Sequence, residues 1–330
     1  MPDILQTGLR GRPPSAPGPR ALAWAAIVVL GIVSVAGWAV YRNRVAHVEP
    51  VAIVTAVDAA MQASQGASID HPRSSGIEAV PVRVPTAPGI RARFEASSDL
   101  YAYVQSLESA ARDNDADAIW MISRVYDYCS PFAMAPAAYD RDTRTIQDMA
   151  MRGSRAMVAA RERISQRCAR FVPQDELTPR MIVLKRAEAA EAGSLAAEAS
   201  LMASGQPLHE TPEYKRDLVQ RVQRSADPEA YSALSPGMGI AASGQTALAD
   251  QVAGTQFAEL AWQLSACRLG LDCGPNSALM TSYCANGGIC SRDPEQDFER
   301  FVFDAAVPRQ GADVINDMID SLMGEKRTRQ

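Results

Sequence analysis

The most apolar stretch of the chain runs from Ala21 to Tyr41 (residues 21–41) and contains no charged residue. A helix of that length is roughly 30 Å long, which matches the hydrocarbon core of a bilayer. Trp24 and Trp38 lie near its two ends, where aromatic rings favour the headgroup region. The run is longer than the apolar part of a signal peptide and ends in Tyr-Arg-Asn-Arg, not in small residues. We therefore predict an uncleaved single-pass transmembrane anchor.

The segments on either side of this anchor are rich in residues that disfavour regular structure. Residues 1–20 are rich in proline, glycine and arginine, and we expect a short cytoplasmic tail. Residues 42–96 include a Ser/Pro/Gly-rich stretch with prolines at positions 81, 85 and 88, which predicts a flexible tether. The remaining residues, 97–330, form the candidate folded domain.

The pattern of residues 97–330 is helical. Alanine is plentiful and aromatic residues make up only 6% of the chain, which favours closely packed helices over sheets. Four helix starts are marked by a capping residue followed by proline: Thr178-Pro179, Thr211-Pro212, Asp227-Pro228 and Asp293-Pro294. We expect closing helices over residues 298–307 and 312–323, and a frayed end after them. The residues expected to be buried are Trp120, Ile122, Leu201, Leu234, Trp262 and Leu264.

A short pattern recurs along this region. It is clearest in AARDNDADAIWMISRVYDYC (110–129) and AAEAGSLAAEASLMASG (189–205), and fainter in SADPEAYSAL (225–234) and GTQFAELAWQLSACRLG (254–270). Each copy predicts a helix with small residues at its end, a tight turn, and a second helix whose first inward residue is alanine. The aligned alanines are Ala118, Ala197, Ala230 and Ala258. One helix pair cannot bury its apolar face alone, so we predict an all-α fold of stacked antiparallel pairs, similar to an α-solenoid.

These motifs resemble the Sel1-like branch of the tetratricopeptide superfamily, whose hallmark is similar to AAxxGDxxAxxxLGxxYxxG. The matching residues are Ala110, Ala111, Asp115, Ala118 and Tyr126 in the first copy, and Ala189, Ala190, Gly193, Ala197 and Gly205 in the second. The intervals between copies are unequal, and Asn114 and Ala226 replace the hallmark glycine. The resemblance implies a protein-binding adaptor. The alternative is an alanine-rich helical hairpin that shares the pattern without belonging to the family.

All six cysteines follow the predicted anchor, and the last four have the spacing C-x5-C-x10-C-x5-C over residues 267–290. Zinc knuckles use gaps of about two to four residues, and His47, His71 and His209 are all distant from this segment in sequence. The even count and the turn-rich intervening residues favour disulfides. Proximity favours the pairs Cys267–Cys273, Cys284–Cys290 and Cys129–Cys168, with Cys267–Cys290 and Cys273–Cys284 as an open alternative.

Disulfides persist in oxidising compartments. The arginines on the two sides of residues 21–41 give only a weak orientation signal, so the cysteines decide the predicted topology. We predict an inner-membrane protein with a cytoplasmic amino terminus and a periplasmic domain.

Candidate chemistry is sparse in this sequence. There is no G-x-S-x-G, H-E-x-x-H, P-loop or G-x-G-x-x-G motif, and the net charge of −5 argues against a nucleic-acid partner. The clustered carboxylates are those expected at helix starts: Asp113, Asp115 and Asp117, then Asp297 and Glu299. We therefore predict no catalytic, cofactor-binding or metal-ligating residue and no small-molecule ligand.

Two functions fit this sequence. The first is a membrane-held module that binds or scaffolds another cell-envelope protein or peptide. The second is an envelope enzyme that uses carboxylates on a glycan or lipid. A cleft with two buried carboxylates would favour the enzyme, and a shallow groove with exposed side chains would favour the binder.

Overall fold

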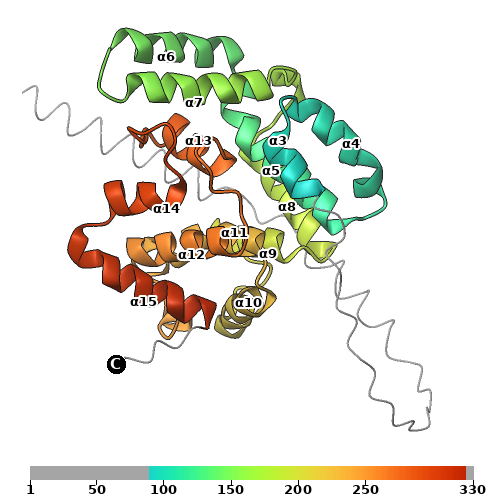
Figure 1. Ribbon diagram of the computed structural model, residues 1–330. Coiled ribbons are helices and arrows are strands. Elements are labelled where there is room, and N and C mark those ends of the chain that lie inside the picture. Colours follow the sequence, from blue (N-terminus) through green and yellow to red (C-terminus); the bar gives the residue numbers. More distant parts are fainter. Residues whose placement is uncertain (1–88, 325–330) are drawn as a thin grey trace, which may run out of the picture. The chain divides into compact units, whose positions relative to one another are not determined.

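The computed structural model describes residues 89–324, and all regular elements within this range are helices or helical turns (Figure 1). The predicted all-α class is thus confirmed for this part of the chain. The predicted anchor at residues 21–41, the tail before it and the last six residues lie outside this range. Between residues 89 and 324, no helix is both long and apolar enough to cross a membrane.

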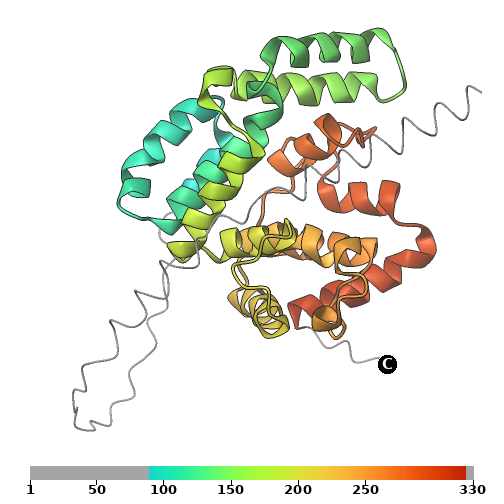
Figure 2. The same ribbon diagram turned by 180° about the vertical axis from the view of Figure 1, so that it is seen from behind.

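One group of helices surrounds α5, with α3, α4 and α8 packed against it (Figure 1). A hairpin made of α6 and α7 lies above this group and projects to one side in both views (Figures 1 and 2). The bounds are α3 Ile90–Ala96, α4 Leu100–Arg112, α5 Ala116–Ala133, α6 Pro136–Asp148, α7 Ser154–Arg167 and α8 Pro179–Glu191, with the 3-10 turn η2 at Pro173–Asp175.

The second group is centred on α11, which packs against α9, α10 and α12, while α15 covers α12. Helix α13 packs on α7 and so connects this part of the chain to the projecting hairpin. The bounds are α9 Leu195–Ala203, α10 Pro212–Ser225, α11 Pro228–Met238, α12 Gln256–Arg268, α13 Ala278–Ala285, α14 Phe298–Phe301 and α15 Ala312–Met323. Short turns lie between them: η3 Ile240–Ala242, η4 Thr246–Leu248, η5 Val302–Ala306 and η6 Arg309–Gly311.

The four aligned alanines occupy equivalent positions. Each is the third residue after a helix N-cap, and each is fully buried: Ala118, Ala197, Ala230 and Ala258. The residue directly before each cap has a positive φ: 62° at Asn114, 102° at Gly193, 49° at Ala226 and 86° at Gly254. The left-handed residue turns the chain sharply before the second helix, so the two non-glycine residues at this position preserve the turn at some steric cost.

Three of the four copies are helix pairs: α4–α5, α8–α9 and α10–α11. The fourth copy lacks its first helix, because η3, η4 and open turns precede α12. Gly239 and Gly244 lie in this stretch and disfavour a continuous helix. The four copies thus share the position of the buried alanine, and the last copy has only its second helix.

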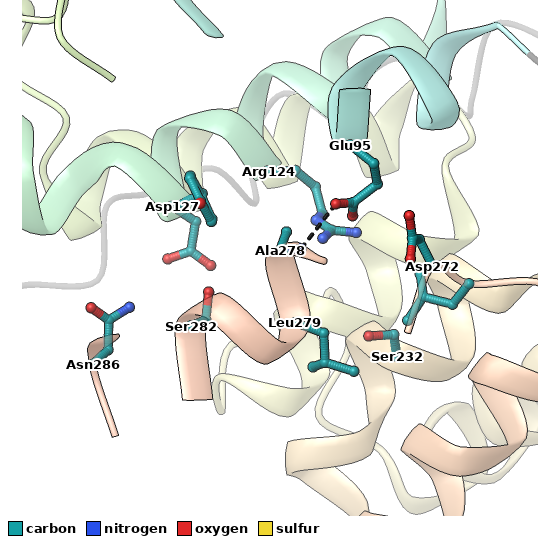
Figure 3. Close-up of a pocket in the computed structure, with 11 residues that line it drawn as sticks. Glu95, Arg124, Asp127, Ser232, Asp272, Ala278, Leu279, Ser282 and Asn286 are labelled. Atoms are coloured by element: carbon teal, nitrogen blue, oxygen red, sulfur yellow. Dashed lines mark hydrogen bonds between the residues drawn. The ribbon is translucent and has the colours of Figure 1, made fainter. Parts of the chain in front are cut away.

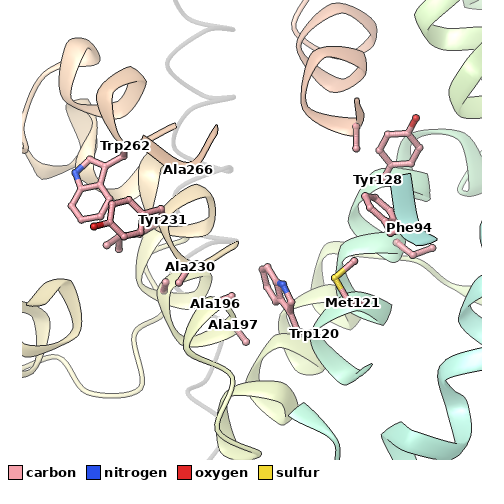
Figure 4. Packing of buried hydrophobic residues seen from close by; sticks show 14 of the residues in the cluster. Phe94, Trp120, Met121, Tyr128, Ala196, Ala197, Ala230, Tyr231, Trp262 and Ala266 are labelled. Atoms are coloured by element: carbon pink, nitrogen blue, oxygen red, sulfur yellow. The ribbon is translucent and has the colours of Figure 1, made fainter. Parts of the chain in front are cut away.

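Large side chains fill the space between the alanine-rich helices. Trp120 of α5 lies between Phe94 and Met121 on one side and the alanines of α9 and α11 on the other (Figure 4). Tyr231 and Trp262 contact each other with ring centroids 4.9 Å apart. All six residues predicted to be buried are buried: Trp120, Ile122, Leu201, Leu234, Trp262 and Leu264.

Three of the four predicted cap-proline junctions start helices. The side chains of Thr178, Thr211 and Asp227 accept backbone N–H bonds at the starts of α8, α10 and α11. The fourth prediction is wrong, because Asp293 accepts the N–H of Glu295 in a turn instead. The helix begins after Asp297, whose carboxylate accepts the N–H of Arg300. This later start allows Phe298 and Phe301 to be buried.

The tether was predicted to extend to residue 96, and the structure contradicts its last part. Helix α3 begins at Ile90, immediately after Pro88 and Gly89, so the prolines precede the helix without interrupting it. Phe94 is only 1% exposed and packs against Tyr103 and Tyr128. The folded domain therefore includes α3, because burial of the Phe94 side chain stabilises this helix despite the proline-rich sequence before it.

The predictions for the two closing helices differ in accuracy. Helix α15 has the predicted bounds and buries Ile315, Ile319 and Leu322, but Val314 is 45% exposed and does not join them. The predicted helix over residues 298–307 is a single α-helical turn, α14, followed by the π-helical turn η5. The helical segment ends at Val307, which is extended with φ −114° and ψ 116°, because Pro308 restricts the residue before it to extended conformations.

The six cysteines form three disulfides: Cys129–Cys168, Cys267–Cys273 and Cys284–Cys290. This is the pairing that proximity favours, and the interleaved alternative is not present. The first disulfide joins α5 to the residue that ends α7 and closes a loop of 39 residues. It holds the base of the projecting hairpin to the centre of the first group.

Substitution of Gly237 by alanine is expected to lower the free energy of unfolding by about 1–3 kcal/mol. A Cβ atom at this position of α11 would lie 2.8 Å from the Cα atom of Ala203 on α9, so the two backbones must move apart. The control is Gly153→Ala, because nothing lies within 4 Å of its added Cβ atom. Urea unfolding measures both variants, and equal stabilities would show that α9 and α11 are not in such close contact.

Candidate functional site

Two adjoining cavities form a groove on the domain, and they share the residues Glu95, Leu271 and Asp272. Their volumes are about 220 and 520 Å³. Helices α3 and α5 line one side, and the α12–α13 loop and α13 line the other (Figure 3). The groove thus brings together residues from distant parts of the sequence.

A buried ion pair lies beside the groove. The carboxylate of Glu229, in the first turn of α11, forms a salt bridge with Arg124 of α5 and accepts a hydrogen bond of 3.3 Å from the indole Nε1 of Trp120. Glu229 is 2% exposed. Burial lowers the pKa of Arg124, but the negative charges of Glu229 and Glu95 raise it by more. The pKa of Arg124 therefore lies above its ordinary value. This pair connects the two groups of helices.

Glu95 projects from α3 into the groove, above Arg124 (Figure 3). Its carboxylate accepts the backbone N–H of Ala278, the first residue of α13, at 2.9 Å. Burial raises the pKa of Glu95 above its ordinary value, and Asp272 raises it further, while the Ala278 N–H and Arg124 act in the opposite direction. The groove therefore disfavours the charge on Glu95 unless a cation approaches it.

The carboxylates that line the groove fall into two kinds. Glu229 is paired with Arg124, and Asp127 is paired with Arg186 at 2.6 Å. Glu95 and Asp272, in contrast, form no ion pair with any residue between 89 and 324, and Asp272 accepts only the N–H of Gly274, at 2.9 Å. Two carboxylates without an ion pair thus face a space large enough for a side chain.

The carboxylates singled out from sequence lie elsewhere. Asp115 and Asp297 cap α5 and α14, as their positions predicted. The expected helix start is wrong for Asp113, which ends α4. Asp117 lies in the first turn of α5, and Glu299 lies in that of α14 and pairs with Arg268 at 3.2 Å. None of them lines the groove.

The histidines do not form a site in the described part of the chain. His209 packs against the ring of Tyr214, with centroids 5.0 Å apart, while His47 and His71 lie outside the described residues. Across residues 89–324, no three histidine, cysteine, aspartate or glutamate side chains are arranged to hold a metal ion.

Sequence reasoning missed the groove residues for identifiable reasons. Glu95 lies in the segment predicted to be a tether, and the Phe94 beside it is the only local sign of a folded helix. Glu229 follows an Asp-Pro cap, where an acidic residue normally faces solvent.

Comparisons with known proteins place the chain in no family. No family model, no curated protein and no solved structure matches it. The described residues define the protein as an all-helical, disulfide-bonded domain with an acidic groove.

Proposed function

We propose that this protein is a binding module of the cell envelope, whose groove takes a basic side chain from an extended segment of another envelope protein. The observation that carries this proposal is the presence of two carboxylates without ion pairs, Glu95 and Asp272, which both line the larger cavity of the groove, of about 520 Å³. A lysine or arginine placed between them would gain charge-assisted hydrogen bonds.

The electrostatics of the groove favour such a ligand. Burial already disfavours an isolated charge on Glu95, and the neighbouring Asp272 adds a like-charge repulsion. A cation between the two carboxylates removes that repulsion, so the groove attracts basic groups more strongly than neutral ones. Lining residues such as Asn276, Ser282 and Asn286 supply further polar groups for a peptide backbone.

The scaffold also suits this role. The recurring helix pairs support the proposed Sel1-like, solenoid-like arrangement, in which a rigid stack presents a surface to a partner. Residues 21–41 would hold the domain on the periplasmic side of the inner membrane, and the three disulfides agree with an oxidising compartment. A domain held there meets neighbouring envelope proteins at a raised effective concentration.

The Glu95→Gln variant tests the proposed ligand class. The detergent-solubilised full chain is presented with a displayed library of short peptides, and the peptides that bind the wild type are expected to contain lysine or arginine. The variant is expected to bind them at least about tenfold more weakly, because a charge-assisted hydrogen bond contributes about 1.5–3 kcal/mol. Its melting temperature at neutral pH should not fall, because the glutamine carbonyl can still accept the Ala278 N–H.

The matched control is Glu188→Gln on α8, where an exposed carboxylate pairs with Lys185 away from the groove. This variant is expected to bind the selected peptides like the wild type. Selection of neutral or acidic peptides, or undiminished binding by Glu95→Gln, would refute the proposal.

One observation favours the alternative function, a carboxylate-dependent enzyme. The groove carries a buried carboxylate, Glu229, and a partly buried one, Glu95, whose raised pKa suits a general acid. Glu229, however, is already paired with Arg124 and hydrogen-bonded to Trp120, so Asp272 would have to serve as the second catalytic carboxylate. Hydrolysis of peptidoglycan by the purified full chain, lost in Glu95→Gln, would establish the enzyme and displace the binding proposal.

A further inference from the structure

The α6–α7 hairpin projects from the domain and ends in an exposed turn (Figures 1 and 2). Only Tyr139 of α6 is buried, so most of this helix faces solvent. The base of the hairpin is fixed by the disulfide between Cys129 and Cys168 and by the packing of α7 on α13. The turn is thus held at a defined place on a rigid support.

Two methionines lie at the tip of the hairpin and face solvent. Met149 is 56% exposed and Met151 is 58% exposed. Ala150 between them has a φ of 49°, and the Ser154 hydroxyl accepts the N–H of Met151 at 3.1 Å. The turn therefore has a defined conformation, and it presents two large apolar side chains that the domain does not cover.

Exposed arginines flank these methionines in the sequence. Arg144, Arg152 and Arg155 are exposed and form no ion pair or side-chain hydrogen bond with residues 89–324. Asp148 is the only acidic residue from position 144 to position 155. The tip is therefore positively charged in a chain whose net charge is −5.

We propose that this tip, residues 144–155, docks on the surface of an anionic membrane. Apolar side chains at the end of a rigid hairpin can enter the headgroup region, while the flanking arginines bind lipid phosphates. Its combination of unpaired arginines and uncovered methionines is complementary to an anionic bilayer. The apolar residues 21–41 of the same chain, predicted to span a bilayer, would keep the domain close to that surface.

Quenching of a tryptophan at the tip by bromine-labelled acyl chains tests this docking. The full chain carries Trp24→Phe and Trp38→Phe to remove the signal of the predicted anchor, and Met149→Trp adds a reporter. It is reconstituted in phosphatidylcholine vesicles with or without about one third phosphatidylglycerol. The control reporter is Gln166→Trp, which lies exposed near the other end of α7.

The expected result is quenching of the tip reporter in the anionic vesicles, much weaker quenching in phosphatidylcholine alone, and none for the control reporter. Arg152→Gln and Arg155→Gln should each reduce the ratio of inserted to free tip about fivefold. Unchanged circular dichroism shows that these exposed substitutions leave the fold intact. An unquenched tip in anionic vesicles, or equal quenching of both reporters, would overturn the proposal and leave the tip as a surface for another protein.

Discussion

The substitution Ile122→Asp is expected to unfold the domain. Ile122 is 4% exposed on α5, the helix that contacts α3, α4 and α8 at the centre of the first group. An unpaired carboxylate in such a site costs several kcal/mol, and the site cannot be relaxed without separating helices. Because whole domains are stable by only about 5–15 kcal/mol, this one change should remove most of the stability. Circular dichroism during thermal unfolding is the measurement.

The control for this prediction is Leu184→Asp on the neighbouring helix α8. Leu184 is an equally apolar residue, but it is exposed, so its replacement should change the melting temperature by only a few degrees. If Ile122→Asp melts like the wild type, the assignment of α5 to the core, and with it the repeat register, is wrong.

The substitution Arg124→Leu is expected to destabilise the domain by about 3–5 kcal/mol. It leaves Glu229 buried between the two groups of helices without its cationic partner. The hydrogen bond from Trp120 remains, but a neutral donor does not compensate for the lost charge. Urea unfolding of the full chain in detergent, followed by circular dichroism, measures the loss.

The double variant Arg124→Leu with Glu229→Leu separates two explanations of that loss. If the cost arises from an uncompensated buried charge, removal of both charges should restore most of the stability, because apolar pairs often replace buried ion pairs without loss. If the double variant is less stable than Arg124→Leu alone, the pair stabilises the fold by its own attraction, and our account of the loss is incorrect.

The local features of the fold could be predicted because they depend on neighbouring residues. The caps at Thr178, Thr211 and Asp227 need only a side-chain oxygen and a following proline. The aligned alanines share one register because the left-handed turn and cap recur before each. Periodicity likewise located α15, where the buried residues Ile315, Ile319 and Leu322 recur every three or four positions.

The groove could not be predicted because it depends on long-range packing. Glu95 and Ala278 are far apart in the sequence, and the folded chain brings the Glu95 carboxylate within 2.9 Å of the Ala278 backbone nitrogen. The predicted start of the domain was wrong for the same reason, because the residues that bury Phe94, such as Tyr128, lie further along the sequence. The composition of residues 42–96 by itself predicted only a proline-rich tether.

Photo-crosslinking from the groove tests the central proposal most directly. A photoreactive amino acid replaces Asn286, an exposed residue that lines the groove, in the full chain inside cells. The control position is Gln220, exposed on α10 and outside the groove. We predict a crosslink to one envelope protein at a segment containing lysine or arginine, reduced about tenfold by Glu95→Gln and absent from the control position. A crosslink that is equally strong in Glu95→Gln, or one that forms equally from Gln220, would contradict the proposed function of the groove.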